Sequence, residues 1–166
     1  MSSLISMGQK AKEASYELGV ASPGQKNEAL TFMAEELIKA KEEIIKANEI
    51  DRQNAIKKGI KDALLDRLSL DDSRIEAMAQ GLLDIVKLQD PVGEVTNMWQ
   101  MPNGLQIGQK RVPIGVLGII YESRPNVTSD AAGLCLKSGN AVILRGASDA
   151  INSNKAVAKA LVAGIK

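Results

Sequence analysis

Residues 111–145 read RVPIGVLGIIYESRPNVTSDAAGLCLKSGNAVILR, and this stretch decides the fold. Val116 to Tyr121 is a short apolar run rich in β-branched residues, and such a run between turn residues predicts a strand buried on both faces. A second run, Ala141 to Leu144, follows the turn-like sequence Ser138-Gly139-Asn140. With a helix between them, the two runs predict a parallel strand–helix–strand unit with a right-handed crossover.

The segment between the two runs carries the signals of a helix. Thr128 or Ser129 is expected to cap it through a side-chain hydroxyl, with Asp130 favourable in the first turn. Gly139 can take the left-handed conformation that ends such a helix. Units of this kind bind ligands beyond the carboxyl ends of their strands, so we expect the functional edge at residues 122–128 and 145–148.

Composition bounds the class of protein. The chain has 166 residues, 45% of them hydrophobic and 25% charged, which is ordinary for one soluble domain with a substantial core. A net charge of +1 and an aromatic content of 2% argue against nucleic-acid binding. One cysteine and no histidine exclude a disulfide framework, a recognisable zinc site and a histidine-dependent catalytic triad from this chain alone. We expect no metal site, no membrane span, no signal peptide and a cytosolic location.

Helical periodicity predicts that the first ninety residues are largely helical. Asn48 and Asp51 share one face, where a role in helix packing is favoured over chemistry. The apolar faces are expected to include Ile38, Ile50 and Ile56. A last helix should open at Asp149 or Asn152. The expected helices of this first part are Ser3–Leu18 ended by Gly19, a stretch from Ser22-Pro23 to Gly59 with a break near Ala40-Lys41, Asp62–Leu68, and one starting at Asp71 or Asp72.

A hairpin is predicted between the helical part and the parallel unit. The extended segments Val92–Met101 and Leu105–Val112 are separated by Pro102-Asn103-Gly104, and Asn-Gly is a strong hairpin signal. A lone hairpin is not stable in water, so this one needs cover from its own domain or from a neighbouring subunit. Two parallel strands and a hairpin also make a poor sheet. The chain is therefore expected to be part of a longer protein, or to complete its sheet with another chain.

Four segments resemble the γ-glutamyl phosphate reductase (glutamate-5-semialdehyde dehydrogenase) family of the aldehyde dehydrogenase superfamily. They are AKEEIIKANEIDRQNA (40–55), DALLDRLSL (62–70), RVPIGVLGIIYESRPNVT (111–128) and CLKSGNAVILRGASDA (135–150). The resemblance implies an α/β, aldehyde dehydrogenase-like fold, in which N-terminal helices and a β-hairpin lead into the first half of a Rossmann-type parallel sheet. It assigns residues 1–90 to the helical part of the cofactor-binding domain, 91–112 to an oligomerisation-type hairpin and 113–166 to the first βαβα of the NADP-binding domain.

The resemblance further implies NADPH-dependent reduction of L-glutamate 5-phosphate to L-glutamate 5-semialdehyde and phosphate, in proline biosynthesis. The nucleophilic cysteine and the catalytic domain are expected outside this chain, so catalysis by the chain alone is not expected. A homo-oligomer and a functional association with glutamate 5-kinase are also implied. Two alternatives stay open: a related aldehyde or acyl-phosphate dehydrogenase, and a non-catalytic nucleotide-binding or assembly fragment.

The cofactor residues implied by the resemblance are Arg145, Ser148, Tyr121 and Glu122. Arg145 ends the second strand where superfamily members place a lysine near the adenine-side ribose, and a guanidinium there would pair with a 2′-phosphate. Ser148 lies where NAD-preferring relatives often carry an acidic residue, so the pair favours NADPH. The alternative is a surface arginine and a helix-cap serine.

Two residues of the loop after the first strand are candidates for substrate chemistry. In relatives an asparagine of this loop stabilises the oxyanion, and Asn126 is the only amide here, although Glu122 fits that position better by spacing. Arg124 is a candidate for binding the phosphate or carboxylate of the substrate, or for a salt bridge that fixes the loop. Cys135 lies in an apolar helical run without a cationic activator, so we expect a buried structural cysteine and not the nucleophile.

Overall fold

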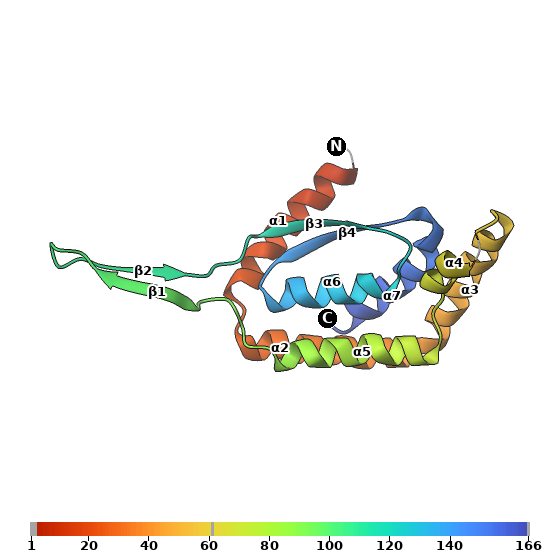
Figure 1. The fold of residues 1–166 in the computed structure, drawn as a ribbon, viewed down its shortest axis with the longest axis horizontal. Helices are drawn as coiled ribbons and strands as arrows, with labels where there is room; N and C mark the ends of the chain where they lie inside the picture. Colours follow the sequence, from red (N-terminus) through yellow and green to blue (C-terminus); the bar gives the residue numbers. More distant parts are fainter. Residues whose placement is uncertain (1–2, 61, 166) are drawn as a thin grey trace.

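The structure is a computed structural model that describes residues 3–60 and 62–165. Its elements follow the order expected from the sequence (Figure 1). They are α1 (Ser3–Val20), α2 (Pro23–Lys39), α3 (Lys41–Lys57), α4 (Asp62–Leu68), α5 (Asp72–Lys87), β1 (Val95–Gln100), β2 (Gln106–Lys110), β3 (Val116–Tyr121), α6 (Asn126–Lys137), β4 (Ala141–Gly146), the 3₁₀ turn η1 (Ser148–Ala150) and α7 (Ile151–Ala163).

Strands β3 and β4 pair in parallel, as the sequence predicts. Their register runs from Val116 opposite Ala141 to Tyr121 opposite Gly146, with α6 as the crossover that packs against both strands. The expectation that β3 is buried on both faces is wrong, because Gly118 is exposed and the Ile120 side chain is 84% exposed. In the described part of the chain, β4 is the only strand paired with β3, so the outer edge of each strand has no strand partner there.

The helices form the main core. Side chains from α2, α3, α5 and α7 pack together, and the largest fully buried ones among them are Leu30, Leu37, Ile44, Ile75, Leu82 and Val157. Helix α6 joins this core at Gly133. A Cβ atom at that position would lie 2.6 Å from Leu82 Cδ2 and 3.0 Å from Ile85 Cδ1. The glycine therefore permits the close approach of α6 to α5.

The buried face of α3 is partly polar. Ile50 and Ile56 are exposed, as is Ile38 of α2, so their expected core positions are wrong. The face carries Asn48 and Asp51 instead, which confirms their role in helix packing. The Asn48 amide donates to Leu68 O at 2.8 Å and accepts from Leu70 N at 2.8 Å, so it fixes the chain after α4.

Asp51 caps a helix that lies about a hundred residues further along the chain. Its Oδ2 accepts from Ser153 N at 2.7 Å and from Ser153 Oγ at 2.6 Å, and its Oδ1 accepts from Asn152 Nδ2 at 2.7 Å and Asn152 N at 3.3 Å. Neither Asp149 nor Asn152 caps α7, because the helix starts at Ile151 after η1 and its N-cap, Ala150, makes no side-chain cap. The free N–H groups at the start of α7 are thus satisfied from α3.

The other predicted caps have mixed outcomes. Ser22 forms a complete capping box with Gln25, and Asp71 accepts from Arg74 N, both as expected. Thr128 and Ser129 do not cap α6, which already begins at Asn126. At the helix ends, Gly59 and Gly139 take positive φ values of 79° and 72°, whereas α1 continues past Gly19 to Val20.

The predicted hairpin is present and projects away from the helices (Figure 1). Strands β1 and β2 pair antiparallel around a turn in which Gly104 N donates to Met101 O and Gly104 has a φ of 88°. Every residue of β1 is exposed, and so is every residue of β2 except Ile107. The hairpin is therefore not covered by its own domain. Cover by a neighbouring subunit remains a prediction.

The hairpin is anchored at its root by a buried ion pair. Asp90 Oδ2 lies 2.5 Å from Lys26 Nζ of α2, and Asp90 Oδ1 accepts from Val92 N at 2.9 Å. Burial pushes the pKa of Asp90 upward, but the hydrogen bonds from Lys26 and Val92 outweigh it and leave that pKa below its ordinary value.

None of the helices in the described part of the chain combines the length and the apolar character that a membrane span requires.

Candidate functional site

The carboxyl ends of β3 and β4 bring the candidate residues to one edge of the sheet. Tyr121 ends β3, Arg145 lies next to the end of β4, and Ser148 begins the 3₁₀ turn that follows. The loop of residues 122–125 leads from β3 into α6. This edge was predicted from the order of strand, helix and strand, since parallel strands end on the same side.

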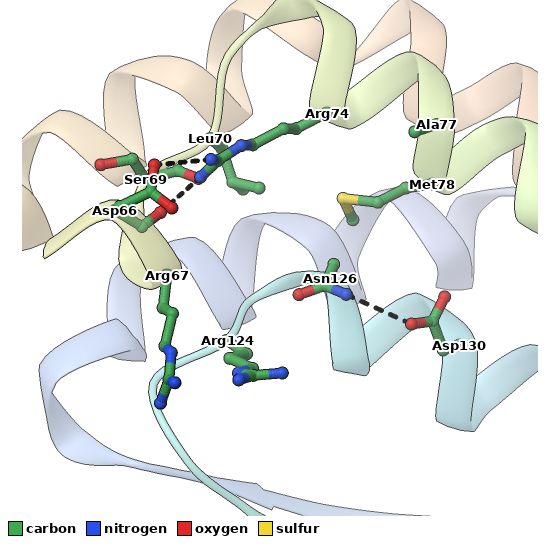
Figure 2. Close-up of a pocket in the computed structure, with 10 residues that line it drawn as sticks. All are labelled: Asp66, Arg67, Ser69, Leu70, Arg74, Ala77, Met78, Arg124, Asn126 and Asp130. Atoms are coloured by element: carbon green, nitrogen blue, oxygen red, sulfur yellow. Dashed lines mark hydrogen bonds and ion pairs between the residues drawn. The ribbon is translucent and has the colours of Figure 1, made fainter. Parts of the chain in front are cut away.

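A cavity of about 510 Å³ opens between this loop and the helices α4 and α5. Figure 2 shows the side chains that surround it. The wall combines cationic, acidic and apolar groups, namely Asp66, Arg67, Ser69, Leu70, Arg74, Ala77, Met78, Arg124, Asn126 and Asp130. The volume suits a small metabolite, and its mixed lining suits a ligand that carries charge.

Arg74 fixes one wall of this cavity. Its Nη2 lies 2.7 Å from Asp66 Oδ1, and its Nη1 donates to Ser69 O at 2.8 Å and to Asp66 O. These bonds tie the end of α4 to the first turn of α5 (Figure 2). Arg74 is thus occupied by the protein itself.

Arg67 and Arg124 are not occupied in that way. No carboxylate of the described residues lies within 4 Å of either guanidinium, so the salt bridge that was the alternative for Arg124 is not formed there. Both side chains also line a second cavity of about 250 Å³, which includes Glu122, Ser123 and Asp149. Asp149 in turn pairs with Lys58 at 2.5 Å.

Asn126 is the first residue of α6 and lines the larger cavity. Its Nδ2 donates to Asp130 Oδ2 at 3.3 Å, as the dashed line in Figure 2 marks. Burial raises the pKa of Asp130, and the hydrogen bond from Asn126 opposes this shift only in part. The amide of Asn126 therefore contacts a carboxyl group in the wall of the cavity.

Arg145 and Ser148 line different cavities. Arg145 lies beside Tyr121, Asn154 and Lys155 in a cavity of about 210 Å³, and its Nη1 donates to Gly146 O at 2.8 Å. Ser148 lines a separate cavity of about 280 Å³ together with Lys57 and Lys58. The two residues thus flank the turn after β4 without sharing one pocket, and Ser148 does not cap α7.

The Tyr121 hydroxyl is part of a buried polar chain. It lies 2.7 Å from Thr128 Oγ1, which donates to Asn154 Oδ1 at 3.2 Å. The Nδ2 of Asn154 is buried and has no hydrogen-bond partner among the described residues. Asn154 lines the same small cavity as Arg145 and Lys155.

Cys135 is confirmed as a structural residue. It is 4% exposed inside α6, and burial raises the pKa of its thiol, so the reactive thiolate is disfavoured. Within the described residues, no cluster of histidine, cysteine or acidic side chains could hold a metal ion.

Four residues of the site were not predicted from the sequence: Arg67, Asp130, Asn154 and Lys155. Arg67 lies inside the segment DALLDRLSL that carries part of the family resemblance, which is the one signal that could have marked it. The others lie on helices whose polar positions look like ordinary solvated faces.

Comparison with known proteins gives a consistent match. No family model matches the chain. The "Gamma-glutamyl phosphate reductase" of Clostridium beijerinckii is 69% identical over all 166 residues, which is 100% of this chain and 40% of that protein. The chain matches the N-terminal portion of γ-glutamyl phosphate reductases.

Solved structures agree with this reductase match. The crystal structure of "Gamma-glutamyl phosphate reductase" from Thermotoga maritima superposes with a TM-score of 0.93 at 46% identity, over 97% of this chain and 39% of that one. A probable aldehyde dehydrogenase from Listeria monocytogenes shares the fold, with a TM-score of 0.60 at 14% identity, over 94% of this chain and 32% of that one. The aldehyde dehydrogenase-like α/β fold is confirmed. This chain spans about 40% of the length of the curated reductases that it matches.

Proposed function

We propose that this chain forms the N-terminal part of an NADPH-dependent γ-glutamyl phosphate reductase of proline biosynthesis. The enzyme would reduce L-glutamate 5-phosphate to L-glutamate 5-semialdehyde, with phosphate as the leaving group and one NADPH and one proton consumed. The observation that carries the proposal is the 69% identity with a curated reductase over the whole chain, including the loop at the sheet edge.

The proposal assigns each part of the chain a place in that enzyme. Residues 1–90 would be the helical part of the cofactor-binding domain, 91–112 an oligomerisation hairpin, and 113–166 the first βαβα of the NADP-binding domain. The cysteine nucleophile and the catalytic domain would belong to the remaining length of the enzyme. A related dehydrogenase with another substrate is the weaker candidate, because the aldehyde dehydrogenase likeness rests on 14% identity.

The side chains near the end of β4 fit the cofactor that the proposal needs. NADPH supplies the hydride when bound, and its 2′-phosphate needs cationic groups and hydrogen-bond donors. Arg145 and Lys155 line one cavity together with Asn154 and offer such cationic donors. Ser148 and Lys57 line a second cavity across the turn, in which Lys58 is already paired with Asp149. Tyr121 and Glu122 would border the cofactor at the end of β3.

The loop after β3 would supply the substrate side. Asn126 lines the larger cavity at the start of α6, and its amide would stabilise the oxyanion of the acyl group after release from Asp130. Arg124 would bind an anionic group of the substrate from the same cavity.

The function is tested in the reverse direction with the full-length protein that carries this chain. We expect NADP⁺ reduction that requires both L-glutamate 5-semialdehyde and phosphate. The variant R145E should raise KM for NADP⁺ at least tenfold and leave KM for NAD⁺ little changed, because it removes one charge-assisted pair and repels the 2′-phosphate. Reduction that does not depend on phosphate would contradict the proposal.

We also propose that the hairpin contacts a second copy of the protein. Its strands expose Val95, Met98 and Trp99, and no cover comes from the described residues. Functional association with glutamate 5-kinase stays a prediction of the family resemblance.

A further inference from the structure

The arginines of this chain divide into two groups by their partners. Arg52, Arg74 and Arg111 form ion pairs with Glu49, Asp66 and Glu94. Arg67, Arg124 and Arg145 have no carboxylate of the described residues within 4 Å. All three of these unpaired arginines lie around the edge where β3 and β4 end.

Arg67 and Arg124 line the same cavities, whereas Arg145 lines a different one. They come from α4 and from the loop before α6, and they line the same two adjoining cavities. In Figure 2 both side chains extend along the loop side of the larger cavity. Two like charges that share a cavity repel each other, and an oxyanion between them would reverse that repulsion.

The acidic side chains of these cavities do not compensate the charges of Arg67 and Arg124. Asp66 is held by Arg74, Asp149 is paired with Lys58, and Asp130 accepts from Asn126 and has a pKa raised by burial. Glu122 lines the smaller cavity but lies beyond 4 Å of both guanidinium groups. Among the described residues, none of the carboxylates that line these cavities therefore forms an ion pair with Arg67 or Arg124.

The backbone around Arg67 is held in place for such a role. Arg74 binds both the backbone and the carboxylate of Asp66, the residue next to Arg67. Leu68, on the other side of Arg67, is fully buried, and its carbonyl accepts from Asn48. The end of α4 is therefore rigid, and only the Arg67 side chain is left to meet a ligand.

We propose that Arg67 and Arg124 together bind one oxyanion, a phosphate or a carboxylate group of the substrate. The identity of that substrate rests on the proposed function, whereas the arginine pair rests on the geometry alone. A guanidinium fork matches either group through two parallel hydrogen bonds. Arg67 is thereby a substrate-binding residue supplied by α4.

The first test measures anion binding to the full-length protein that carries this chain, with inorganic phosphate and L-glutamate as separate probes. Titrations are followed by NMR at the arginine Nε–H groups, for the parent, R67Q, R124Q and the double variant. R111Q is the matched control, because Arg111 pairs with Glu94 at the root of the hairpin and lines neither cavity. All variants are checked for an unchanged backbone spectrum.

We expect at least one of the probes to bind saturably and to shift both Arg67 and Arg124. R67Q and R124Q should each raise its Kd about tenfold, which is the loss of one charge-assisted pair. The double variant should lose little more, because a shared ligand makes the two effects non-additive. Linear shifts with both probes, unchanged binding in R67Q, or an equal loss in R111Q would overturn the proposal.

The second test uses the full-length enzyme in the reverse direction, where phosphate and the semialdehyde are separate substrates. A higher KM for phosphate in R67Q assigns the pair to the phosphate group, and a higher KM for the semialdehyde assigns it to the carboxylate. A change confined to KM for NADP⁺ would refute the assignment to substrate. If the enzyme lacks reductase activity while R67Q still loses anion binding, the proposed function fails and the arginine site stands.

Discussion

Among the described residues, Asp51 makes the most hydrogen bonds to a distant part of the chain. Its carboxylate is 2% exposed and accepts from the backbone and side chains of Asn152 and Ser153. D51A would leave these buried donors without a partner, and we expect it to lower the free energy of unfolding by about 3 kcal/mol. Urea denaturation measures the loss.

The control for D51A lies on the same helix. Glu42 is exposed and lies 3.8 Å from Lys46, so E42A should change stability by less than about 0.5 kcal/mol. Equal effects of the two substitutions would show that Asp51 contributes no more than a surface carboxylate.

Asp130 predicts a pH dependence of opposite sign to that of an ion-paired acid. Burial raises its folded-state pKa above the ordinary value of 3.8, so the folded protein binds this proton more tightly than the unfolded chain. Its contribution to stability is therefore present at low pH and is lost as pH rises above that value. D130N should be more stable than the parent at about pH 7, and the difference should vanish toward about pH 4.

The comparison for D130N is D84N, measured by the same denaturation series. Lys87 and Gln80 lower the pKa of Asp84, so this carboxylate stabilises the fold above its ordinary pKa. D84N should accordingly be less stable than the parent at neutral pH, with a difference that shrinks on acidification. A common sign for both variants would contradict this account.

For single residues, the sequence predicted the place of a side chain in the fold better than it predicted which other side chains it contacts. Residues 122–126 and Arg145 were expected at the sheet edge, because strand order alone places them there. Arg67 was missed, since its contact with the same cavities depends on how α4 packs beside the loop. Arg74, seven residues further on, is paired with Asp66, whereas Arg67 is not. The sequence alone does not distinguish the paired arginine from the unpaired one.

At the scale of elements, the contact between α5 and α6 depends on a missing side chain. A Cβ at Gly133 would overlap Leu82 and press on Ile85. We expect G133A to lower the free energy of unfolding by about 1–3 kcal/mol, because the buried Leu82 and Ile85 side chains would have to shift within a packed core. G8A is the control, since a Cβ at Gly8 in α1 has no atom within 4 Å, and it should stabilise by about 0.5–1 kcal/mol. Thermal unfolding of both variants checks the difference in sign.

The elements themselves were largely predictable, because periodicity and turn residues act locally. The capping box at Ser22, the break at Ala40 and the end of α6 at Gly139 are local features of this kind. The start of α7 and the partners of Asp51 were not, because they depend on a contact between residues 51 and 152–153. Exposure of Ile120 likewise depends on which elements cover the sheet.

At the scale of the whole molecule, the hairpin is the most exposed feature. If it joins two copies, M98E and W99E should weaken self-association at least tenfold, because each places a charge in an apolar contact. The free energy of unfolding of the single chain should hardly change, since both side chains are exposed. Sedimentation velocity over a range of concentrations measures the association. K46E is the control for charge, because Lys46 is exposed on α3 and not on the hairpin. An association that survives both M98E and W99E would rule out the hairpin as the contact.

The reach of Asp51 across the chain also sets an order of events in folding. The first amides of α7 find their acceptor in α3, so that end of the helix is completed only after a loop of about a hundred residues has closed. In native-state hydrogen exchange, the Ser153 amide should be released only by global unfolding, while amides of the exposed hairpin exchange through local opening. In D51A the same amide should exchange with the fraying end of α7. Exchange of the Ser153 amide thus reports when α3 and α7 have come together during folding.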